Sequence, residues 1–169
     1  MTTLNNIKVI FAYIYFDAPN KKEIERKAQE LVGQGNKASS LVDILYGVND
    51  ENDYKDTIRN LSKELNIDIP PHKEAGFLLA EYYAESIING DMDSYEGAKN
   101  IWQNIEVNEE YESEFEDLKI FGGLVSEYDD FQDKEHVDFY GKDGCTKQLE
   151  KTKESIVEEA KIVIANRSK

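Results

Sequence analysis

Carboxylates are the most frequent side chains in this chain that could do chemistry. Glu109 and Glu112 form a Glu-x-x-Glu pair, and Glu127 and Asp130 form a Glu-x-x-Asp pair further along. Residues three apart share one face of a helix, so each pair could offer oxygen ligands to one cation. Mg²⁺ bound by one or two carboxylates commonly carries substrate phosphates. The two pairs therefore raise the question of a magnesium site.

These pairs resemble the motifs of helical nucleoside-triphosphate pyrophosphohydrolases, in which such carboxylates hold magnesium against a polyphosphate. The resemblance implies a magnesium-dependent enzyme as an alternative function. If residues 109–131 form one helix, Glu112 and Glu127 lie roughly 22 Å apart along its axis and cannot share a metal. Only a chain reversal at Gly122-Gly123 would bring them together. We expect a solvated acidic face instead.

Other metal sites lack the residues they need. A di-iron bundle requires two Glu-x-x-His motifs, and the chain has only His72 and His136. The segment Asp91-Met92-Asp93 begins like a calcium loop. Glu96 and Trp102, however, occupy the positions that should carry the glycine and the bidentate acid. We therefore expect no metal and no cofactor.

Cys145 is the single cysteine, so the chain cannot form an internal disulfide. This indicates a reducing cytoplasm. A thiol nucleophile needs a base, and only His136 or His72 could supply one. The surrounding residues carry no sign of an activated thiol, so we expect no catalytic residue. The longest apolar run, residues 9–16, is too short to span a bilayer.

Negative charge is concentrated in one part of the sequence, which we call the acidic region (residues 106–138). It holds thirteen acidic and two basic residues, which gives −11 of the chain's formal −15. Charge of this sign repels nucleic acid and anionic membranes and attracts basic proteins. A solvated surface without a partner is the alternative interpretation. We take as candidate partner-binding residues Glu109, Glu110, Glu112, Glu116, Glu127, Asp129, Asp130 and Asp133.

Residues 71–89 are expected to form a central apolar helix. Pro70 and Pro71 suit its first positions, where a missing N–H costs nothing, and Gly90 suits the position after its end. Apolar side chains cover most of its circumference, which is typical of a helix surrounded by others. We expect Gly122-Gly123 to approach this helix closely or to mark a kink.

Periodic apolar residues predict seven or eight helices in one all-α domain spanning residues 1–169. Residues 4–16 fit either a strand or a helix. We choose a helix because no second strand is available to pair with it. Further helices are expected after caps at Asn20, at Ser39 or Ser40, at Asp93 and at Thr146. Other helices are expected over 54–65 and 109–131, and residues 132–144 should be irregular.

The run from Asn89 to Trp102, with the later Phe121–Glu127 segment, resembles small uncharacterised bacterial helical proteins with a Gly-x-x-x-x-x-Glu-Gly-Ala-x-x-Ile-Trp pattern. The motif implies a capped helix start and a tight glycine contact, and no catalytic role. Small acidic bacterial proteins also resemble immunity proteins as a class. We expect a cytoplasmic protein that binds a basic protein, the alternatives being the pyrophosphohydrolase and a DNA-mimic inhibitor.

Overall fold

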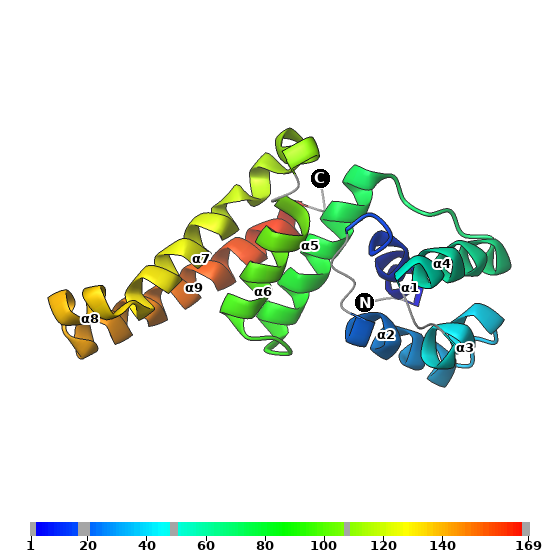
Figure 1. Ribbon diagram of the computed structural model, residues 1–169, viewed down its shortest axis with the longest axis horizontal. Coiled ribbons are helices and arrows are strands. Elements are labelled where there is room, and N and C mark those ends of the chain that lie inside the picture. Colours follow the sequence, from blue (N-terminus) through cyan, green and yellow to red (C-terminus); the bar gives the residue numbers. More distant parts are fainter. Residues whose placement is uncertain (1–2, 17–20, 48–50, 107–108, 167–169) are drawn as a thin grey trace. The chain divides into compact units, whose positions relative to one another are not determined.

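A computed structural model describes residues 3–16, 21–47, 51–106 and 109–166. These residues form helices and no strand, which confirms the predicted all-α class (Figure 1). The described part of the chain contains nine α-helices, against the seven or eight expected, together with a π-helical and a 3₁₀ segment. Within it, no helix has both the length and the apolar composition needed to cross a bilayer.

The chain divides into two compact units, unit 1 (residues 1–79) and unit 2 (residues 80–169). The boundary falls inside one continuous helix, α5 (His72–Asn89). The expectation of a single domain over the whole chain stays a prediction.

Unit 1 is a cluster of short helices in which α3 packs against α2 and α4, and α1 packs against the same two helices. Its helices before α5 are α1 (Thr3–Ala12), α2 (Lys21–Gly33), α3 (Ser39–Tyr46) and α4 (Glu51–Leu65).

Helix α1 confirms the choice of a helix for residues 4–12, whereas residues 13–16 of the same segment form a turn. Val9, Ile10 and Phe11 are consecutive and at most 1% exposed, so several faces of the helix are buried at once. A helix buried on many sides carries apolar residues at spacings that also fit a strand, which explains the ambiguous sequence pattern. The cap expected at Asn20 lies outside the described residues.

The cap expected at Ser39 or Ser40 is wrong. Helix α3 has Ala38 at its N-cap position, and no side chain caps it from there. The carboxylate of Glu64 in α4 takes this role, because it accepts the Ser39 hydroxyl and, at 3.1 Å, the Ser40 N–H. These hydrogen bonds lower the pKa of Glu64, the one from Ser39 most. Glu64 is distant from α3 in sequence, yet it satisfies a free N–H group at the start of this helix that a local capping side chain would otherwise satisfy.

Helix α5 begins at His72, so Pro70 and Pro71 precede it and do not occupy its first positions as predicted, and it ends before Gly90 as the sequence predicts. Gly90 has φ +75°, a left-handed conformation that favours glycine after a helix. The central position predicted for this helix is inferred from the apolar side chains around most of its circumference, and it stays a prediction. Tyr83 and Ala84 are buried completely in unit 2.

Unit 2 is built around two long helices, α7 and α9, that run side by side, with α6 contacting both (Figure 1). A short helix, α8, contacts both α7 and α9 at one end of the pair. In chain order after α5 the elements are α6 (Ser94–Ile101), the π-helical segment η1 (Trp102–Glu106), the 3₁₀ segment η2 (Glu109–Leu118), α7 (Lys119–Gln132), α8 (Lys134–Tyr140) and α9 (Lys142–Asn166).

The single helix expected over residues 109–131 is wrong. Segment η2 has 3₁₀ geometry, and Phe115 inside it has non-helical angles, φ −118° and ψ 29°. In an α-helix, Glu110 would face Glu114 and Glu112 would face Glu116, and like charges four apart destabilise helices. Phe115 and Leu118 are both buried, so the break places two apolar side chains in the core.

The irregular segment expected over residues 132–144 is also wrong, because α8 occupies most of it. Gly141 follows α8 with φ +75° and allows the chain to turn into α9. Helix α9 starts at Lys142, so Thr146 lies inside it and is not the predicted cap. The Thr146 hydroxyl donates to the Lys142 carbonyl at 2.9 Å.

At Gly97 in α6, the absence of a side chain permits a close contact with another helix. A Cβ at this position would lie 2.5 Å from Cγ1 and 2.6 Å from Cδ1 of Ile87 in α5. Helices α5 and α6 are therefore in close contact at Gly97.

Gly122 and Gly123 mark no kink, because α7 continues through both. A Cβ at Gly123 would meet no atom within 4 Å, so a close helix contact at Gly123 is wrong. Gly122 is buried in a helix that packs on α9 and α6, and its expected approach to α5 stays a prediction.

We expect Gly97→Ala to lower the free energy of unfolding by about 1–3 kcal/mol, since the added methyl group overpacks the contact with Ile87. Urea unfolding followed by circular dichroism measures the change. A stabilised Gly97→Ala variant would show that Ile87 moves aside without cost.

We expect Gly123→Ala to raise the free energy of unfolding by about 0.5–1 kcal/mol, because glycine inside an exposed helix costs backbone entropy. The same measurement applies, and the two glycines are matched controls for each other. A loss of stability at Gly123→Ala would contradict the open surroundings described above.

Candidate partner-binding face

Helix α7 has an apolar side and an acidic side. Phe121, Leu124 and Val125 are buried, in the unit where α7 packs on α9 and α6. Glu127 and Asp130 are exposed and lie one turn apart. The apolar residues follow the helical period, so the helix that buries them must direct these acids to solvent.

Asp133 connects the acidic side of α7 to α8. It is the C-cap residue of α7 and the N-cap residue of α8, and its carboxylate accepts the Glu135 N–H at 3.0 Å. A carboxylate at a helix start satisfies a free N–H and faces the positive end of the helix dipole. Asp133 therefore has a structural role as well as a surface position.

We define the acidic face as the exposed carboxylates of α7 and α8 together with Asp133 between them. Each of its members is exposed to solvent. They are Glu127, Asp129, Asp130, Asp133, Glu135 and Asp138.

The eight predicted partner-binding residues fall into two groups separated by the break at Phe115. Glu109, Glu110 and Glu112 lie in η2, and their side chains are outside the described part. Glu116 is also in η2, where its side chain is 74% exposed and lies 3.8 Å from Lys119. The other four belong to the acidic face, and the structure brings them together at the end of α7: Glu127, Asp129, Asp130 and Asp133.

Asp129 already has a partner inside unit 2. It accepts the Tyr95 hydroxyl at 2.8 Å, and the Tyr95 ring stacks on Tyr128 with centroids 4.5 Å apart. The hydrogen bond to Asp129 raises the pKa of Tyr95 to about 12, and partial burial adds to it. These contacts join α6 to α7 and fix the position of Asp129 in the acidic face.

A second polar contact joins α6 to α9. Lys153 lies 3.1 Å from the Asp93 carboxylate and 5.7 Å from the centre of the Tyr128 ring. Asp93 caps α6 by accepting the N–H groups of Tyr95 and Glu96, as the sequence predicts. Burial alone would raise the pKa of Asp93, but the hydrogen bonds from Lys153 and from the Glu96 N–H outweigh it and lower the pKa.

Helix α8 adds residues that the sequence analysis did not select. Phe139 is 81% exposed and Tyr140 is 55% exposed. With Glu135 and His136 they line a surface hollow of about 230 Å³. The i, i+4 spacing of Glu135 with Phe139, and of His136 with Tyr140, was the available signal. The prediction of an irregular segment over residues 132–144 does not use this spacing.

The predicted alternatives for chemistry gain no support from this arrangement. The magnesium site depended on a reversal at Gly122-Gly123, and α7 passes through both glycines. In the part of the chain that is described, no three His, Cys, Asp or Glu side chains gather in a way that could hold a metal ion. Cys145 is buried in α9, only 2% exposed.

Comparison of the chain with protein-family models, with curated proteins and with solved structures found no match.

We expect Tyr95→Phe to lower the free energy of unfolding by about 0.5 kcal/mol at neutral pH, the low end for one hydrogen bond, because the pair is exposed. The folded pKa of Tyr95 is raised to about 12 from 10.0. The stabilisation should therefore be complete below pH 10 and disappear as the pH rises to about 12. Urea unfolding across this range measures it.

Ultraviolet titration of tyrosinate supplies the control. Tyr54 also has a pKa of about 12, raised by burial and by Glu25, so Tyr54→Phe should remove a second late-titrating tyrosine without affecting the Tyr95 contact. If Tyr95→Phe instead removed a tyrosine that titrates near pH 10, the hydrogen bond to Asp129 would be absent in solution.

Proposed function

We propose that this protein is a non-enzymatic, cytoplasmic binding protein of the immunity or inhibitor type, whose acidic face binds a basic surface of a partner protein. The observation that carries the proposal is a group of exposed carboxylates that the fold leaves available. No hydrogen bond or ion pair within the described ranges engages Glu127, Asp130 or Asp138.

The local charge supports this function. The acidic region carries −11 of the formal −15, and the structure exposes its acids along α7 and α8. A solubility role would be served equally well by acids spread over the whole surface. Concentrated charge instead creates a potential that attracts a basic protein and accelerates association.

The negative charge of the acidic face also limits the kinds of molecule that can bind to it. Nucleic acid and anionic membranes carry the same sign of charge as this face and are repelled by it. A basic protein surface gains attraction at long range, and its Lys and Arg side chains can pair with the carboxylates at short range. The immunity or inhibitor type is an analogy of class, drawn from chain size and acidity.

A pull-down from the native cells at low and high salt tests the function, followed by kinetics with the purified partner. The triple variant Glu127→Gln, Asp130→Asn, Asp138→Asn removes available carboxylates without changing side-chain size. We expect it to lower the association rate constant roughly tenfold at low salt and to flatten the salt dependence.

The matched control makes the same change of charge at exposed acids outside the acidic region: Asp43→Asn, Asp68→Asn and Glu154→Gln. It should associate almost as fast as the parent protein. Recovery of no basic protein at either salt concentration would contradict the proposal, and so would an equal effect of both triple variants.

A further inference from the structure

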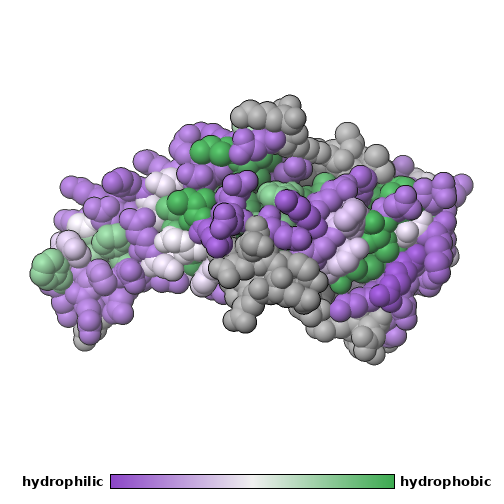
Figure 2. Space-filling model, turned by 90° about the horizontal axis from the view of Figure 1, so that it is seen from above, coloured by the Kyte–Doolittle hydropathy of each residue, from purple (hydrophilic) through white to green (hydrophobic). Residues whose placement is uncertain are grey.

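The end of α8 presents two aromatic rings to solvent. Phe139 is 81% exposed and Tyr140 is 55% exposed, and their rings meet edge to face with centroids 4.8 Å apart. Hydrophobic atoms appear at this end of unit 2 among hydrophilic ones (Figure 2). Large aromatic side chains placed together on a surface usually contact another molecule.

The rings around Tyr140 form a supported platform. The His136 ring is nearly parallel to the Tyr140 ring, at 14° and 6.1 Å between centroids. Phe131 at the end of α7 meets both rings edge-on, at 5.9 Å from His136 and 6.0 Å from Tyr140. Side chains fixed by packing before binding lose less entropy when a ligand arrives.

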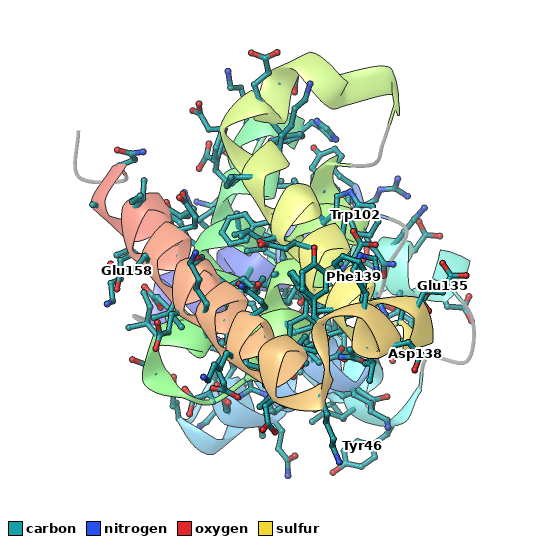
Figure 3. The ribbon with its side chains drawn as sticks, turned by 90° about the vertical axis from the view of Figure 1, so that its left-hand side faces the viewer. Tyr46, Trp102, Glu135, Asp138, Phe139 and Glu158 are labelled. Atoms are coloured by element: carbon teal, nitrogen blue, oxygen red, sulfur yellow. The ribbon has the colours of Figure 1, made fainter. Side chains whose placement is uncertain are left out.

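Carboxylates flank this platform. Glu135, His136, Phe139 and Tyr140 line the hollow of about 230 Å³, which we call the aromatic hollow. Asp138 lies one turn after Glu135 and next to Phe139, and these three side chains all come from α8 (Figure 3). The hollow therefore combines flat apolar faces with negative charge at its edge.

We propose that the aromatic hollow binds an arginine side chain on the surface of a basic partner protein. This inference rests on the proposed function and places the main contact with the partner protein at α8. A guanidinium group is flat, stacks on aromatic rings, and donates paired hydrogen bonds to a carboxylate. Phe139 or Tyr140 supplies the ring, and Glu135 or Asp138 supplies the carboxylate.

Charge and geometry favour arginine over other occupants. A lysine ammonium is strongly hydrated and cannot donate a fork of hydrogen bonds while it stacks. A second copy of this chain would bring another formal −15 against the same carboxylates. An anionic lipid surface is repelled in the same way.

Two peptides of equal charge test the proposal, one of alternating arginine and glycine and one of alternating lysine and glycine. Fluorescence anisotropy at low salt measures their affinity for the full chain. We expect the arginine peptide to bind more tightly and the variant Phe139→Ala, Tyr140→Ala to weaken it about three- to tenfold. The variant should also lose the preference for arginine.

Two further variants make the result specific. Tyr46→Ala removes an aromatic side chain that is 86% exposed and lies in unit 1, so it should leave the affinity unchanged. The exchange Phe139→Tyr, Tyr140→Phe keeps both rings and should retain the preference for arginine. Circular dichroism and thermal unfolding confirm that each variant is folded.

Equal binding of the two peptides, or full arginine binding by Phe139→Ala, Tyr140→Ala, would overturn this inference. If Glu127→Gln, Asp130→Asn, Asp138→Asn still slowed association with the cellular partner, the proposed function would stand without it. Self-association in sedimentation velocity that only Phe139→Ala, Tyr140→Ala removes would identify the occupant as a second copy and would also overturn the inference.

Discussion

Helix α7 must bury one side in the core of unit 2 while its other side carries closely spaced carboxylates. Burial of Phe121, Leu124 and Val125 supplies the favourable term, roughly 1.5–3 kcal/mol for each large apolar side chain. Repulsion between exposed carboxylates is weakened by water and salt to a fraction of that. The carboxylates are therefore compatible with helix α7 only at positions exposed to solvent, and these positions lie on one face of the helix.

A positive charge near the acidic face is engaged in contacts that hold helices of unit 2 together. Lys153 of α9 pairs with the Asp93 carboxylate and lies over the Tyr128 ring, so its charge is directed to the start of α6. Tyr95 stacks on that ring and donates to Asp129. These contacts hold α6, α7 and α9 together, and Glu127, Asp130 and Asp138 stay at the surface with no hydrogen bond or ion pair to the residues that the structure describes. Stability and available charge thus depend on the same helix arrangement.

Local rules predicted a large part of the fold from the sequence. The all-α class follows from helical periods, and the first helix follows from the lack of a second strand for residues 4–16. The Asp93 cap and the end of α5 at Gly90 follow from side-chain and backbone preferences within one turn. The acidic region was visible as composition alone, because charge needs no structure to be counted.

Tertiary structure decided what depends on residues far apart in sequence. The Glu64 carboxylate replaces a local cap at Ser39 and Ser40, and no nearby pattern could show this. Gly97 makes a close contact because Ile87 packs against it, whereas Gly123 faces open space. The aromatic hollow required α8, a seven-residue helix too short for its period to be distinctive. Sequence fixes local preferences, whereas packing between distant segments determines which of them persist and which side chains reach the surface together.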